Sequence, residues 1–142
     1  MSWQKNQGGR KMKCPSCMIE IMEIDLTGIK IKYCIKCEGI WLSENKLIYL
    51  LQNKKKFKKT INSLNKTSID NRNYSCPECE EKMENLVSNQ KNKSSDSKLI
   101  IDACPQKHGY WFEKGNLLKF IKRNNLDKNN QTINKFKNIF VN

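Results

Sequence analysis

All seven cysteines and the single histidine of this 142-residue chain lie in four short hooks. The hooks are Cys14-Pro-Ser-Cys17, Cys34-Ile-Lys-Cys37, Cys76-Pro-Glu-Cys79 and Cys104-Pro-Gln-Lys-His108. Two or three residues between two ligands allow the backbone to turn both toward one ion, and such hooks combine in pairs. The spacing therefore predicts two metal sites, one with four thiolates and one with three thiolates and an imidazole.

The donor atoms favour zinc. Zinc takes four tetrahedral ligands from thiolate and imidazole, and an odd cysteine count without an export signal fits a disulfide framework poorly. Rubredoxin-type iron uses the same four thiolates, so the sequence leaves zinc and iron open at the first site. Redox chemistry is disfavoured because the Cys-x-x-Cys pairs recur with matched partners, and a catalytic zinc is disfavoured because no ligand position is left open. We expect two structural Zn2+ ions and no enzyme activity. The expected ligands are Cys14, Cys17, Cys34, Cys37, Cys76, Cys79, Cys104 and His108.

The second half of the chain repeats the first, which predicts a tandem duplication. The alignment without a gap pairs Cys34 with Cys104, Gly39 with Gly109, Trp41 with Trp111, Leu47 with Leu117 and Leu51 with Ile121. In this register Cys37 lies opposite Lys107, and His108 lies opposite Glu38, so the fourth ligand comes one position later in the second half. The last hook therefore needs a different backbone turn.

Each half is expected to be a β-hairpin followed by a helix. Apolar and polar residues largely alternate over 18–25 and 29–33 around a glycine turn. The corresponding strands of the second half are expected at 82–88 and 98–102, joined by a polar loop at 89–97. Helical spacing follows each second hook, with Ser43 as the cap of the first helix. We expect Trp41 and Trp111 to be buried, covering the hairpin and holding the helix against the zinc knuckle.

The predicted fold is therefore a small, metal-stabilised α+β protein of two tandem zinc-ribbon-like modules. The expected divisions are a basic N-terminal arm (1–13), zinc module 1 (14–53), a basic linker (54–75), zinc module 2 (76–123) and a basic C-terminal tail (124–142). Modules of about forty residues need a metal or disulfides to fold, because their cores are too small.

The string from Cys14 to Leu47 resembles the transcription-factor-IIB-type zinc-finger domain of small, mostly prokaryotic proteins, and Cys76 to Leu117 resembles a variant of it. The resemblance implies the same eight metal ligands and a role in nucleic-acid or transcription-related binding. Family members commonly follow the tryptophan with Leu-Asp-x-Gly-Glu-Leu. This chain departs from that pattern, with Ser43, Asn45 and Lys46 in one copy and Glu113, Gly115 and Asn116 in the other.

The net charge of +13 lies outside the hooks and hairpins. Residues 52–75 carry a net charge of +6, whereas 14–51 carry −1 and 76–121 are neutral. The densest run holds Lys54, Lys55, Lys56, Lys58 and Lys59. Lysine is a point charge for phosphates, while arginine is preferred for reading base edges, so these lysines favour nonspecific contact with nucleic acid. Biased composition also explains a lysine excess, because the chain has 24 Lys and 3 Arg.

We expect a noncatalytic zinc protein that binds nucleic acid or a nucleoprotein assembly through its basic linkers. The alternative is a protein-interaction adaptor whose charge only keeps it soluble, and an iron electron carrier or thiol redox protein is less favoured. No apolar run approaches the roughly 18 residues of a membrane helix, so a cytoplasmic protein without a membrane or small-molecule ligand is expected. In the tail, Ile133, Phe136, Ile139 and Phe140 have the spacing of an amphipathic helix that docks on the modules or on a protein partner.

Overall fold

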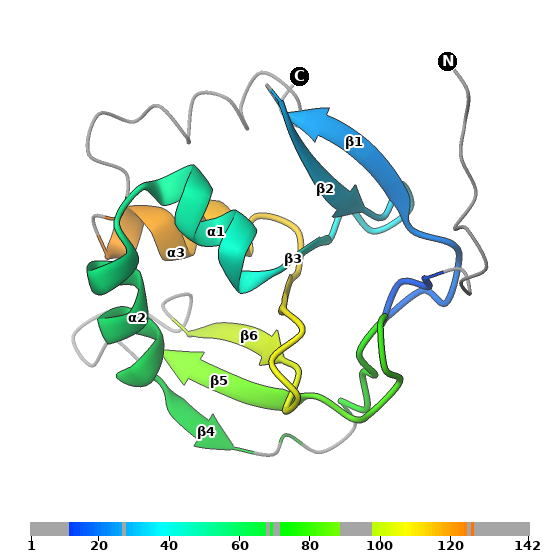
Figure 1. The fold of residues 1–142 in the computed structure, drawn as a ribbon. Helices are drawn as coiled ribbons and strands as arrows, with labels where there is room; N and C mark the ends of the chain where they lie inside the picture. Colours follow the sequence, from blue (N-terminus) through cyan, green and yellow to red (C-terminus); the bar gives the residue numbers. More distant parts are fainter. Residues whose placement is uncertain are drawn as a thin grey trace.

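The computed structural model describes residues 12–26, 28–67, 69, 72–88, 98–124 and 126. In this part of the chain, seven strands form one antiparallel sheet and three helices pack against it (Figure 1). The strands are β1 (Met22–Leu26), β2 (Ile29–Tyr33), β3 (Ile40–Leu42), β4 (Asn65–Thr67), β5 (Glu84–Ser88), β6 (Leu99–Ala103) and β7 (Tyr110–Phe112). The helices are α1 (Glu44–Leu51), α2 (Lys54–Asn62) and α3 (Asn116–Arg123). The protein is thus a small α+β fold.

The sheet contains strands from both halves of the chain in the order β1-β2-β3-β7-β6-β5-β4. Strands β1 and β2 pair around Gly28, which has a φ of +94°, and β5 pairs antiparallel with β6. The first strand of each pair starts later than the sequence pattern suggests, at Met22 and Glu84. Before these residues the chain makes only isolated bridges, from Lys13 to Glu20 and from Ser75 to Lys82.

Strands β3 and β7 join the two halves at the centre of the sheet. Trp41 lies directly opposite Trp111, and Ile40 and Leu42 pair with Phe112 and Tyr110. This register is reciprocal, so an approximate twofold axis passes between the tryptophans, as in a symmetric dimer interface. The sequence repeat predicts two modules but does not show that they share one sheet.

The glycines beside this seam are in contact with the tryptophans of the opposite half. A Cβ added to Gly39 would lie 2.3 Å from Cζ2 of Trp111, and one added to Gly109 would lie 2.9 Å from Cζ2 of Trp41. Both tryptophans are buried, as expected. The expectation that they hold the helix against the zinc knuckle is wrong, because both indoles lie among the cysteines, in a different cluster from the helices. Each indole packs instead against the glycine of the other half.

Different kinds of residue cover the two faces of the sheet. Side chains alternate along a strand, so Ile40 and Leu42 point to one face and Trp41 to the other. The first face packs against the helices in a large apolar cluster that includes Phe57, Phe112 and Phe120. The second face holds both tryptophans together with cysteines from all four hooks.

The helices begin as the local sequence requires. Ser43 caps α1 by accepting a hydrogen bond from the backbone N–H of Lys46 at 3.2 Å, as the sequence predicts. Gln52 then adopts a left-handed conformation and ends α1, and Asn53 caps α2 through the N–H of Lys56. Helix α3 follows Gly115, which has a φ of +80° and offers no side-chain cap.

The segment expected as a linker, residues 54–75, is largely structured. It contains α2, and then β4, which pairs with β5 at the edge of the sheet. Further along, Arg72 makes an ion pair of 2.6 Å with Asp102, whose side chain is fully buried and also accepts a hydrogen bond from Asn85. The guanidinium binds both carboxylate oxygens, which fixes this part of the chain on β6.

Several sequence predictions lie outside the described residues. These are the polar loop 89–97, most of the basic arm 1–13, and the amphipathic helix expected in the C-terminal tail. Among the described residues, no helix has the length and apolar content needed to cross a membrane.

Candidate metal centres

The first cluster joins the two hooks of the N-terminal half. The Sγ atoms of Cys14, Cys17, Cys34 and Cys37 all lie within 4.8 Å of one another. Cys14 and Cys34 are fully buried, while Cys17 and Cys37 are partly exposed. The β1–β2 pairing brings the hooks together, because a hairpin places its two outer ends side by side.

The second cluster joins the two hooks of the C-terminal half in the same way. Cys76, Cys79, Cys104 and His108 each offer one ligand atom, and these atoms also lie within 4.8 Å of one another. The Nδ1 atom of His108 faces the thiols, at 3.4 Å from Sγ of Cys104 and 3.9 Å from Sγ of Cys76. The structure therefore brings together all eight residues that the sequence singled out, in the predicted sets.

All four hooks close with the same outer hydrogen bond. The N–H of the first cysteine donates to the carbonyl five residues later, for example from Cys14 to Ile19 at 2.8 Å and from Cys104 to Gly109 at 3.1 Å. Backbone N–H groups inside each hook also point at the first sulfur, as from Cys17 to Cys14 at 3.2 Å. Such donors stabilise a thiolate and orient it.

The inner turn of the last hook differs from the other three. Met18, Glu38 and Glu80 have left-handed backbones and donate to the carbonyl four residues earlier. In the last hook the left-handed residue comes one position sooner, at Lys107, which donates to Cys104 only three residues earlier. This tighter turn is the backbone change that the sequence alignment predicts for His108.

The thiols in each cluster influence one another's ionisation. Burial, together with the neighbouring thiols, raises the pKa of Cys37 and of Cys76 to about 12. Burial also acts to raise the pKa of Cys34, but backbone N–H groups and the adjacent thiols outweigh it and lower this pKa below its usual value. One thiolate thus forms at the expense of its neighbours, and the clusters need a cation if all their thiols are to ionise.

The donor positions fit tetrahedral zinc. Zn–S bonds of about 2.3 Å place two sulfurs about 3.8 Å apart, and a Zn–N bond of about 2.0 Å places nitrogen and sulfur about 3.5 Å apart. The Cys14–Cys37 and Cys79–Cys104 sulfur separations are 3.7 Å and 3.6 Å. Bound zinc holds the thiolates ionised and cross-links the hooks.

The indole groups beside the clusters are not equivalent. The Nε1–H of Trp41 donates to the carboxylate of Glu78 at 3.3 Å, across the seam between the halves. The residue that matches Glu78 in the first half is Ser16, and the buried Nε1–H of Trp111 has no hydrogen-bond partner among the described residues. The sequence gives no signal for the Trp41–Glu78 bond, because it depends on how the halves pair.

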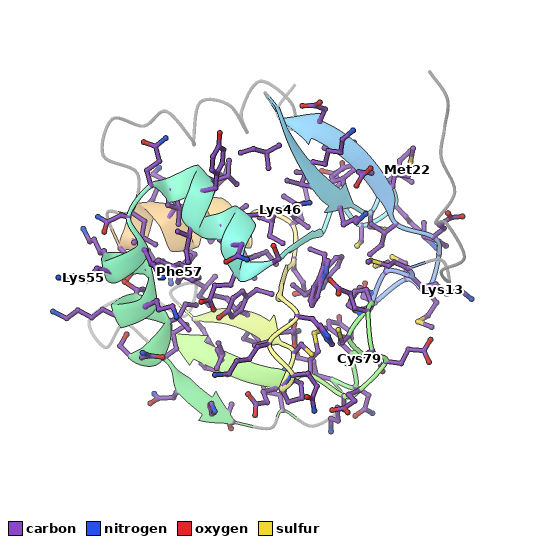
Figure 2. All side chains as sticks on the ribbon, in the orientation of Figure 1. Lys13, Met22, Lys46, Lys55, Phe57 and Cys79 are labelled. Carbon is purple, nitrogen blue, oxygen red and sulfur yellow. The ribbon has the colours of Figure 1, made fainter. Side chains whose placement is uncertain are left out.

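The lysines singled out from the sequence belong to neither donor set. Lys54, Lys55, Lys56, Lys58 and Lys59 are all exposed on α2, on the helical face of the sheet. Lys58 pairs with Glu44 at 3.2 Å. Lys55 and Cys79 lie in different parts of the molecule in Figure 2. Lys58, by contrast, lines a cavity together with Cys104 and Lys107 of the last hook.

Comparison with known families finds a similarity that covers the first centre. The family model described as transcription factor zinc-finger, of the TFIIB zinc-ribbon type, matches residues 13–53. The match contains the whole first cluster and ends at the cap of α2. For the second cluster, the geometry of the four donors is the support. No curated protein and no solved structure matches the chain. The family match and the two clusters together support two structural zinc ions.

Proposed function

We propose that the chain is a noncatalytic protein of two tandem zinc-ribbon-like modules, which binds the phosphates of nucleic acid through α2. The repeated hooks and the reciprocal Trp41–Trp111 register support the tandem arrangement. A structural role for both metals follows from the donor sets, because each has four protein ligands and no position for a substrate or water.

The observation that carries the proposal is the position of the lysines within α2. Lys54, Lys55 and Lys56 occupy its first turn, which has no acidic residue. A helix N-terminus carries a partial positive charge, so cations there destabilise the helix by a few tenths of a kcal/mol or more. Helix stability therefore does not account for the run, whereas binding of an anionic backbone does.

Helix α2 is also held firmly enough to present these side chains. Phe57, at its centre, is fully buried and makes edge-to-face contacts with Tyr110 at 6.0 Å and Phe120 at 6.3 Å. Such aromatic pairs contribute about 0.5–1.5 kcal/mol each beyond burial. The lysines thus project from an ordered surface rather than from a linker.

A salt titration tests the proposal. Binding of a short DNA duplex and of an RNA strand of equal length is measured by fluorescence anisotropy over a range of KCl concentrations. We expect binding to weaken steeply with salt, because each phosphate contact contributes about 0.9 to the slope of log K against log salt for duplex DNA. The double variant Lys54→Gln/Lys55→Gln should lower this slope, and absence of binding at low salt would refute the proposal.

A second candidate is the protein-interaction adaptor. Met18 and Ile35, in the two hooks of the first cluster, are each 62% exposed, whereas Glu80 and Pro105 occupy the matching positions of the second cluster. An apolar knuckle tip on one side only suits contact with a protein. The adaptor function is favoured if nucleic acid does not bind at low salt.

A further inference from the structure

We infer that the phosphate-binding surface extends from α2 onto α3, where Lys119 and Lys122 contact the same polyanion. This inference rests on the proposed function and enlarges its site. The two helices are more than fifty residues apart in the sequence, and only the fold brings them together.

The contact between the helices is direct and buried. Phe57 of α2 meets Phe120 of α3 edge to face at 6.3 Å, and both rings are fully buried. Both helices cover strands of the second half: α2 through the contact of Phe57 with Tyr110 of β7, and α3 through a hydrogen bond of 3.3 Å from Asn116 to the carbonyl of Ile100 in β6. Figure 1 shows them on the same side of the sheet. Their outer faces therefore belong to one surface.

The charged side chains of these two helices are all basic, although Glu44 of α1 pairs with Lys58. Neither α2 nor α3 contains an acidic residue, whereas α2 carries five lysines and α3 carries Lys119, Lys122 and Arg123. Helix α1, which corresponds to α3 in the repeat, has one acidic and one basic residue, Glu44 and Lys46. The excess charge is thus concentrated on two of the three helices.

The spacing of the lysines along each helix places like charges close together, which lowers helix stability, and a bound polyanion removes this repulsion. Lys55 and Lys59 are four residues apart on α2, and Lys119 and Lys122 are three apart on α3, so each pair lies on one face of its helix. Like charges at these spacings destabilise a helix by about 0.2–0.5 kcal/mol per pair. The helix dipole favours the cations in the last turn of α3 but not Lys119 at mid-helix.

The exposed side chains of α2 and α3 favour binding to a nucleic-acid backbone over binding to a membrane. A membrane-binding helix presents an apolar face beside its cations. Here Phe57, Leu117, Phe120 and Ile121 are buried in the core, and the exposed large apolar side chains of the described residues lie elsewhere, at Met18, Met22, Ile35 and Tyr49. Phosphodiester groups pair with the lysine ammonium groups and require no apolar face on the helices.

The test compares three double variants with the wild type. The α2 variant is Lys54→Gln/Lys55→Gln, the α3 variant is Lys119→Gln/Lys122→Gln, and the matched control, Lys13→Gln/Lys36→Gln, removes the same charge near the first metal cluster. Figure 2 places Lys13 and Lys55 at opposite ends of the molecule in that view. Circular dichroism and a content of two zinc ions per chain verify that each variant is folded.

We expect the α2 and α3 variants each to lower the salt slope for a DNA duplex by about 1–2, and the control variant to leave it unchanged. If the α3 variant behaves like the control while the α2 variant loses binding, the inference is wrong and the proposed function stands. If the wild type binds no nucleic acid at low salt, the proposed function fails and the inference with it. Binding to anionic phosphatidylserine vesicles, lost in the α2 and α3 variants, without binding to nucleic acid would also overturn the inference.

Discussion

Substitution of Gly39 by alanine tests the seam between the two halves. The new Cβ would lie 2.3 Å and 2.5 Å from Cζ2 and Cη2 of Trp111, whereas carbon atoms pack at about 3.5–4.0 Å. Trp111 is fully buried and cannot move aside. Gly39 does not have a positive φ, so alanine suffers no backbone strain there. The cost comes from overpacking alone, at about 1–3 kcal/mol.

A double-mutant cycle with Trp111→Phe isolates this contact. Phenylalanine lacks the outer edge of the indole benzene ring that the new Cβ would strike. Trp111→Phe alone is destabilising because it leaves a cavity, but it relieves the clash in the double variant. We expect the two changes together to cost at least about 1 kcal/mol less than the sum of the single changes, within the range measured for residues in contact.

The assay is urea unfolding followed by circular dichroism, with zinc in constant slight excess. Gly28→Ala is the matched control, because Gly28 has a φ of +94° and a Cβ there would meet nothing within 4 Å. Its cost should arise from backbone strain and should add to that of Trp111→Phe. Additivity of Gly39→Ala and Trp111→Phe within about 0.5 kcal/mol would show that the seam is not packed as described.

Other features of the structure give four further predictions. Removal of zinc by a chelator should unfold the chain, and a circular dichroism spectrum unchanged after complete removal would contradict the structural role of the metal. Ser16→Glu places a carboxylate at the position equivalent to Glu78, so the indole N–H of Trp111 gains an acceptor. The free energy of urea unfolding should rise by about 1 kcal/mol. No rise would count against the twofold symmetry between the two halves. Arg72→Met leaves the carboxylate of Asp102 buried without its counter-charge and should cost about 3–5 kcal/mol in urea unfolding, whereas a cost below about 1 kcal/mol would be inconsistent with this ion pair. Burial and a hydrogen bond to a carboxylate raise the pKa of Tyr74 to about 12. The protonated tyrosine therefore contributes fully to stability below the unfolded pKa of about 10, and this contribution is lost as pH rises toward 12. The difference in unfolding free energy between wild type and Tyr74→Phe should shrink over that interval, and a constant difference would argue against the pKa shift.

The metal ligands were predictable because their chemistry is local. Two ligands in one hook are separated by only two or three residues, and the alternating pattern of the hairpin is itself enough to bring two hooks together. The alignment also predicted a different backbone turn in the last hook, because His108 lies one position later than the matching ligand, but only the structure shows that the turn is tighter and lies at Lys107. The Ser43 cap was visible for the same reason, since a cap involves only the first turn of a helix.

The lysine run was visible as charge, but its conformation was not. Residues 54–75 have the composition of a linker, but Phe57, Ile61 and Leu64 pack against the core. The aromatic partners of Phe57 come from the second half of the chain. Similarly, Arg72 has no visible partner in the sequence until β6 places Asp102 beside it.

The sequence by itself determined the two sets of donors, the hairpins beside them and the sign of the surface charge, since each depends on residues near one another along the chain or on composition alone. Only the tertiary structure decided that β3 and β7 join both halves in one sheet, and that α2 and α3 stand together. Pairing of two strands depends on free edges and on the fit of Gly39 against Trp111 and Gly109 against Trp41. These contacts link residues about seventy positions apart, and no local pattern records them.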